Sequence, residues 1–119
     1  MSLMWITILV FAVAAVIGLT MALAVFKGQF PPVPSAVLHG LFGATGLVLL
    51  IVAVFVHHVV GPVQWAFWLF LIAALGGFFI AFGFHAKKKT IPPALVVVHA
   101  SVAVVGFLLL LAGVLNLIA

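Results

Sequence analysis

Four long apolar stretches limit what this chain can fold into more than any other feature. They cover residues 3–26, 35–60, 63–84 and 94–119. Each is long enough for a membrane-spanning helix, which needs about 20 apolar residues. Charged residues make up only 3% of the chain, whereas a water-soluble domain carries roughly 25%. We therefore predict an all-α integral membrane protein with four transmembrane helices in a bundle, a single domain over residues 1–119.

Proline-containing breaks separate these stretches. Segments 27–34 and 85–93 each combine lysine with prolines, and Gly61-Pro62 forms the tight turn between the second and third stretches. Proline cannot continue a helix but suits the first turn of the next one. We expect consecutive helices to run in opposite directions, with no residues left over for a soluble domain.

The two halves of the chain match when one is shifted by sixty residues against the other. Chance matches of Leu, Val and Ala carry little weight in so apolar a sequence, but rarer residues match at the same shift. These are Trp5 with Trp65, Lys27 with Lys87, Pro32 with Pro92, His39 with His99 and Gly46 with Gly106. We predict two tandem two-helix hairpin repeats, 1–60 and 61–119, related by a pseudo-two-fold axis along the membrane normal.

The lysines predict how the chain lies in the membrane. All four fall in the segments 27–34 and 85–93, and no other residue is charged. The positive-inside rule places these loops in the cytoplasm and both termini outside, as expected for a multi-pass protein of the cytoplasmic (inner) membrane. The lysines can meet lipid phosphates of the bilayer, cofactor propionates or an acidic partner. We expect no nucleic-acid partner.

The residues missing from the sequence exclude several chemistries. The chain has no Asp, Glu or Cys. Paired-carboxylate catalysis, Ser-His-Asp triads, carboxylate-bound Mg²⁺ or Ca²⁺, thiolate zinc sites and iron–sulfur clusters are therefore excluded. Five histidines remain as the side chains that bind metals well or titrate near neutral pH. This composition favours an electron carrier or an accessory subunit over a stand-alone enzyme.

His39 and His99 are the leading candidates for a functional role. They lie at matching positions inside two different spans, and ionisable residues at such depth usually face the interior of a bundle. Two symmetric imidazoles are suited to be the axial ligands of one haem iron. We predict that both ligate haem b, with Lys27 and Lys87 near its propionates. A structural hydrogen bond, or a role with another metal, a quinone or protons, is the alternative.

Small residues accompany this histidine pair. Seven residues make almost two full turns of helix, so Gly46 shares a face with His39, and Gly106 shares one with His99. Gly43 lies between His39 and Gly46. We predict that these three glycines make room for a flat macrocycle. Close helix packing is the alternative explanation, and both are compatible.

The other three histidines lack a partner in the opposite half. His57 shares a face with His39, but its match is Leu117, so only a second copy in a homodimer would complete a symmetric site. We interpret His57 and His58 as interfacial residues at a helix end. His85 follows the third stretch, where a solvated cation at the C-terminus of a helix is favourable.

These features predict a small b-type haem protein with bis-His ligation that transfers electrons, with a quinone or another redox partner. The chain resembles membrane b-type cytochromes in one respect, the paired histidines on separate spans of a four-helix bundle. The alternative is a non-catalytic accessory subunit of a larger membrane complex. A small transporter or channel ranks third, because proton-coupled carriers usually rely on acidic residues within the membrane.

Overall fold

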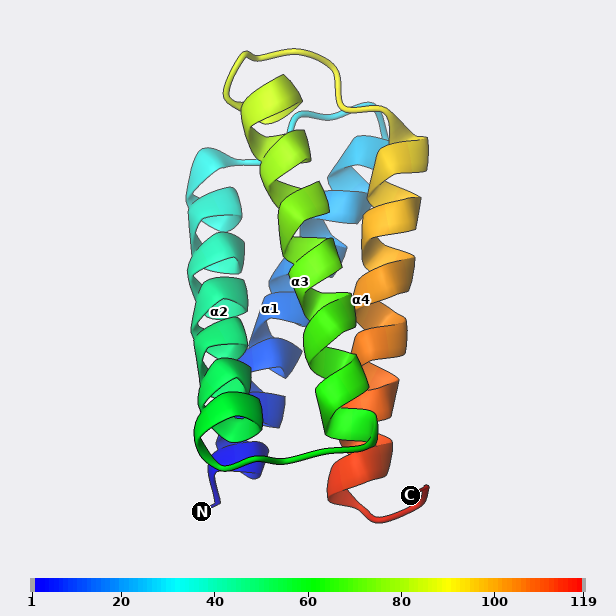
Figure 1. The fold of residues 1–119 in the computed structure, drawn as a ribbon. Helices are drawn as coiled ribbons and strands as arrows, with labels where there is room; N and C mark the ends of the chain where they lie inside the picture. Colours follow the sequence, from blue (N-terminus) through cyan, green and yellow to red (C-terminus); the bar gives the residue numbers. More distant parts are fainter. Residues whose placement is uncertain (1, 119) are drawn as a thin grey trace.

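The computed structural model describes residues 2–118, and every regular element in this range is helical. Figure 1 shows an elongated bundle with extents of 41 × 21 × 21 Å. Its helices are α1 (Leu3–Phe26), α2 (Val33–Ile51), α3 (Pro62–Ile80) and α4 (Pro93–Val114). Two short π-helical segments, η1 (Val52–Val56) and η2 (Ala81–His85), extend α2 and α3.

The four predicted apolar stretches form helices that are long and apolar enough to cross a membrane. The structure confirms the prediction of an all-helical chain with four such helices. Their bounds differ by a few residues from those expected. The second helix begins at Val33 rather than at residue 35 because Pro34 is accommodated in its first turn. The last helix ends earlier than expected, at Val114.

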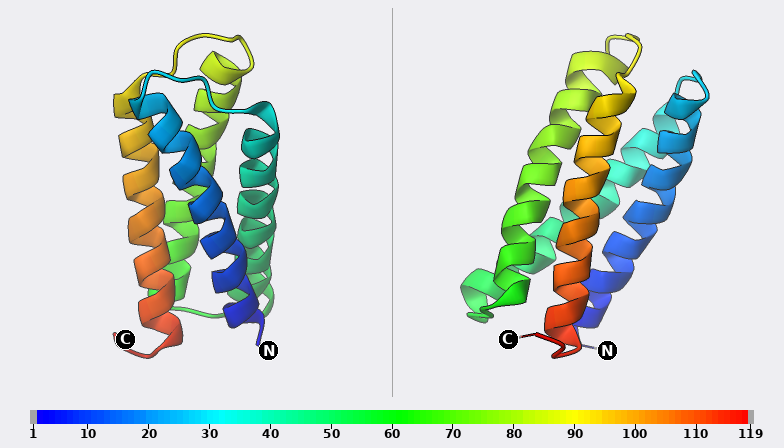
Figure 2. Two further views of the ribbon diagram at one scale, coloured as in Figure 1. Left: turned by 180° about the vertical axis from the view of Figure 1, so that it is seen from behind. Right: turned by 90° about the vertical axis from the view of Figure 1, so that its right-hand side faces the viewer.

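Consecutive helices run in opposite directions, and each loop joins two of them at one end of the bundle (Figures 1 and 2). The most extensive contacts lie within the hairpins α1–α2 and α3–α4, and α1 also packs on α4, and α2 on α3. Consequently α2 and α4 lie diagonally opposite each other. Both termini lie at one end, and the two lysine-containing loops lie at the other.

Both lysine-containing loops begin with a similar backbone turn. Gly28 and Lys88, one residue in each loop, adopt left-handed φ angles of 71° and 55°. The amide of the following residue then bonds back to the helix, from Gln29 to the carbonyl of Ala24 over 2.8 Å and from Lys89 to that of Phe84 over 2.9 Å. Such turns satisfy the free carbonyl groups at helix C-termini. They bring the two lysine-containing segments together at one end of the bundle.

Large apolar residues fill the centre of the bundle. Leu50 and Leu110 are fully buried, and the rings of Phe11 and Phe70 stack with centroids 3.8 Å apart at an interplanar angle of 6°. Many other large apolar side chains are exposed on the outside, among them Val16 at 65%. A bundle with so apolar an outer surface is suited to a lipid environment.

Candidate functional site

The structure brings His39 and His99 together in the interior of the bundle. They extend from α2 and α4, the diagonally opposed helices, and both side chains are half-buried. Their ring centroids lie 6.1 Å apart, and the ring planes form an angle of 74°. Residues that the sequence separates by sixty positions thus form one imidazole pair.

The ring of His39 is held by a backbone hydrogen bond. Its Nδ1 lies 2.8 Å from the carbonyl oxygen of Ala14 in α1. A carbonyl oxygen only accepts hydrogen bonds, so Nδ1 carries the proton and Nε2 retains its lone pair. Metal-bound histidines commonly have this arrangement, with one ring nitrogen donating to a backbone carbonyl and the other free to coordinate.

His99 lacks the equivalent anchor. Its Nδ1 is buried and has no hydrogen-bond partner among residues 2–118. The carbonyl of Ala73 in α3 lies nearby but does not complete a hydrogen bond with it. The two imidazoles therefore differ, because only that of His39 is fixed by its neighbouring helix.

Two glycines that our sequence analysis did not identify make space for these rings. A Cβ atom on Gly18 of α1 would lie 2.8 Å from Cε1 of His39, and one on Gly77 of α3 would lie 3.1 Å from Cε1 of His99. Each imidazole therefore lies against the backbone of the other helix in its hairpin. The sequence contains only a weak signal for this role, because Gly18 would match residue 78 at the shift of sixty and the glycine is at residue 77 instead.

The predicted glycines have other neighbours. A Cβ on Gly46 would meet the ring of Phe11 at 2.6 Å, and one on Gly106 would contact Phe70 at 3.4 Å. The space beside both glycines therefore holds the phenylalanine stack. Gly43 has no atom within 4 Å of its Cβ position. Contact of these glycines with a cofactor stays a prediction.

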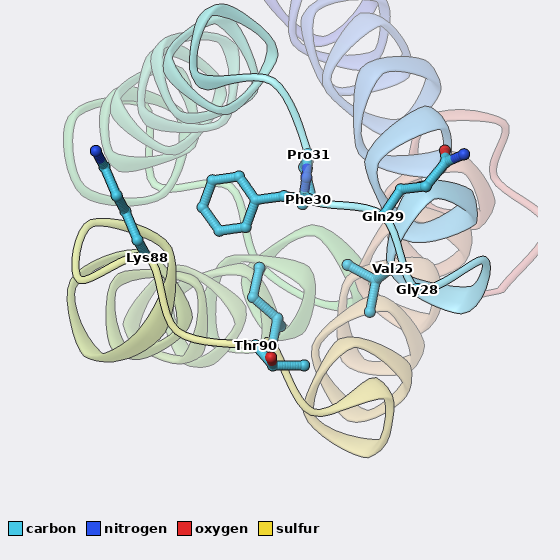
Figure 3. Close-up of a pocket in the computed structure, with 8 residues that line it drawn as sticks. Val25, Gly28, Gln29, Phe30, Pro31, Lys88 and Thr90 are labelled. Carbon is cyan, nitrogen blue, oxygen red and sulfur yellow. The ribbon is translucent and has the colours of Figure 1, made fainter.

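Lys27 and Lys87 are exposed at the loop end of the bundle, as are the other two lysines. A pocket of about 120 Å³ lies between the two loops. Figure 3 shows the ammonium group of Lys88 and the amide of Gln29 directed away from it, while Phe30 and Pro31 extend over its centre. Lys88 is the one lysine among the residues that line the pocket, and its charged group points away from the centre.

The expectation of a solvated His85 was wrong. The side chain is only 9% exposed, and its Nε2 donates a hydrogen bond to the carbonyl oxygen of Pro31 over 2.8 Å. Its ring also stacks on Phe30, with centroids 4.5 Å apart and an interplanar angle of 3°. The expectation considered only the dipole of its own helix, whereas the partners come from the loop of the other hairpin. His85 joins the two loops.

His57 and His58 are exposed in the connection between η1 and α3. Within residues 2–118, no group of three or more His, Cys, Asp or Glu side chains could hold a metal ion. His39 and His99 are the histidine pair in the interior of the bundle.

Comparisons with known proteins give no assignment. No protein-family model matches the chain, and neither the curated proteins nor the solved structures compared with it contain a match. The proposals below therefore depend on the chemistry and geometry of the chain's own residues.

Proposed function

We propose that this chain is a small membrane b-type haem protein in which His39 and His99 are the axial ligands and which transfers electrons. The distance between the two rings carries the proposal. Metal–imidazole bonds are about 2 Å long, and a ring nitrogen lies about 1 Å from its ring centre. Two imidazoles on one metal therefore place their centroids about 6 Å apart, and those of His39 and His99 lie 6.1 Å apart.

The hydrogen bond of His39 supports the same function. Because Nδ1 donates to Ala14, the lone pair of Nε2 is available for iron. Haem would supply one-electron redox chemistry, which no side chain of this sequence provides. The residues of the chain would hold the iron, exclude water from it and set the polarity around it.

The macrocycle would lie on the loop side of the phenylalanine stack. Phe11 and Phe70 occupy the interior at the level of Gly46 and Gly106, so the ring would lie nearer the loops, at the histidines. His39 is the seventh residue of α2, which places it about 9 Å from the start of the helix at 1.5 Å per residue. Lys27 and Lys87 would then pair with the propionates, since the chain has no carboxylate side chain to compete.

The proposed setting is the cytoplasmic membrane. The lysine loops would face the cytoplasm and both termini the outside, because cationic loops are retained on the cytoplasmic side. We also interpret the hairpins as tandem copies. The burial of both Leu50 and Leu110, and the left-handed backbone at both Gly28 and Lys88, support this interpretation. A quinone or a protein redox partner would exchange electrons with the haem.

A reduced-minus-oxidised absorption spectrum of the protein purified in mild detergent tests the proposal. We expect the sharp Soret and α bands of a six-coordinate b-type haem. His39→Ala and His99→Ala should each abolish the low-spin bands, while His58→Ala, which changes an exposed histidine, should retain them. Equal haem content in all three variants would show that the pair does not bind haem. A colourless protein, even after haem is added during expression, would remove the proposal.

A further inference from the structure

A groove between α3 and α4 passes beside His99. Its volume is about 130 Å³. Ala73, Gly76 and Phe79 of α3, and Leu95, Val98 and His99 of α4, line much of it. Phe79 is 59% exposed and Val98 is 61% exposed, so the groove opens on the apolar outer surface of the bundle. A ligand would therefore enter it from the lipid phase.

An unsatisfied polar atom lies in His99, at the wall of this groove. Nδ1 of His99 is buried without a hydrogen-bond partner. Of the His99 atoms, it is the one that a Cβ on Gly76 would approach, at 3.9 Å. A side chain at Gly76 would therefore stand against this nitrogen. A buried polar atom without a partner is costly and calls for an explanation.

The comparison with His39 shows that an imidazole Nδ1 without a hydrogen-bond partner is particular to the second hairpin. In the first hairpin, the carbonyl of Ala14 accepts the hydrogen bond of the imidazole. If Nε2 of His99 binds the haem iron, its Nδ1 must carry a proton and needs an acceptor. Among the described residues, only the carbonyl of Ala73 lies nearby, and its geometry does not complete a hydrogen bond with Nδ1. An external acceptor would complete the site.

We propose that the groove binds the head group of a membrane quinone, with one quinone carbonyl accepting a hydrogen bond from Nδ1 of His99. A quinone combines an apolar ring, which suits walls such as Phe79, with a carbonyl acceptor at its edge. A lipid acyl chain would fill the walls but leave the nitrogen unpaired. The inference rests on the proposed electron-transfer function, because it identifies a quinone as the redox partner of the haem that His99 would ligate.

Equilibrium binding of decylubiquinone to the full-length protein in lipid nanodiscs tests this site. Gly76→Leu should weaken binding about tenfold or more, because the added side chain occupies the space beside Nδ1. Gly40→Leu is the matched control, since Gly40 is an exposed helical glycine with no atom within 4 Å of its Cβ position. The Gly40→Leu variant should bind decylubiquinone as tightly as the wild-type protein does. Gly76→Ala, whose Cβ makes only an ordinary contact, should fold and bind with intermediate strength.

Nitrogen-15 NMR of histidine-labelled protein gives a second measurement. Decylubiquinone should shift the Nδ1 resonance of His99, assigned by its loss in His99→Gln, and leave that of His58 unchanged. Equal binding by the Gly76→Leu and Gly40→Leu variants would overturn the proposal. So would equally tight binding of decylbenzene, which has no carbonyl, or an Nδ1 proton already bonded to Ala73 and unaffected by the quinone.

The failure of this inference is distinguishable from failure of the haem assignment. A protein that shows b-type haem bands but binds no decylubiquinone would retain the proposed function and exclude the quinone site. A haem-free protein that binds decylubiquinone at the groove would retain the site and exclude the haem.

Discussion

The ring of Phe11 lies directly against Gly46, so that a Cβ on this glycine would come within 2.6 Å of the ring's Cζ. The glycine therefore holds α1 and α2 close together through an aromatic side chain. Gly106 has the matching position in α4, but its Cβ would meet Phe70 and Leu69 at 3.4 Å, an ordinary contact distance. Two glycines that look equivalent in the sequence thus have different packing requirements.

This difference predicts that a glycine-to-alanine substitution has different effects on the free energy of unfolding at the two positions. Gly46→Ala should lower the free energy of unfolding by about 1–3 kcal/mol, the usual cost of overpacking an interior. Gly106→Ala should leave stability unchanged or raise it by up to about 1 kcal/mol, since alanine favours helix. Reversible unfolding in mixed micelles, followed by circular dichroism, measures both. Equal destabilisation of the two variants would contradict the packing described here.

Gly18 should control the position of His39. In Gly18→Ala, the new methyl group would lie 2.8 Å from Cε1 of the imidazole, so the ring must move and its hydrogen bond to Ala14 weakens. Loss of such an orienting contact commonly reduces metal affinity about 10–100-fold. Haem titration of the detergent-solubilised protein measures the effect. Gly40→Ala, which changes an exposed glycine with open space around its Cβ position, is the control and should bind haem normally.

His85 should stabilise the loop end of the bundle. In His85→Ala, the buried carbonyl of Pro31 loses its donor, which costs about 1–3 kcal/mol. We expect a lower unfolding temperature and faster tryptic cleavage after Lys27. His85→Phe retains the stacking on Phe30 but not the hydrogen bond, so it should have an intermediate effect. His57→Ala changes an exposed residue and should alter stability by no more than about 0.5 kcal/mol.

Leu110 should be among the most sensitive core positions. It is fully buried, so Leu110→Ala would leave a cavity and destabilise the bundle by about 2–5 kcal/mol. Leu108, two residues away, is 57% exposed, and Leu108→Ala should have little effect. The unfolding midpoints of the two variants in the same detergent give the comparison. Similar midpoints would mean that the face of α4 assigned to the core is incorrect.

Single cysteines can test the proposed orientation, because the sequence contains none of its own. In intact cells, a membrane-impermeant maleimide should label Ser2→Cys, at the end of the bundle that carries the termini. It should label Lys88→Cys, in a lysine loop, only after the membrane is permeabilised. The reverse pattern would place the lysines outside, against the positive-inside rule.

The formation of four apolar helices was predictable from the sequence, because local properties of the chain determine where each helix forms. Uninterrupted apolar length defines each candidate span, and Pro34 and Pro93 mark helix starts whatever surrounds them. The meeting of His39 and His99 was also predictable in outline, since equal positions in two hairpins imply equal depth. The neighbours of each ring were not predictable, because Gly18 and Gly77 deviate from the sixty-residue shift that relates the two histidines.

The sequence by itself determined the number of helices, their apolar character and the placement of every charge in two loops. Only the tertiary structure decided that Phe11 and Phe70 fill the interior beside Gly46 and Gly106, that His85 bonds to Pro31, and that Nδ1 of His99 lacks a partner. The physical reason is that packing and hydrogen bonding depend on helix rotation and on contacts between distant residues. Almost every face of every helix in this chain is apolar, so the hydropathy pattern indicates neither the rotation of a helix nor its contacts with distant residues.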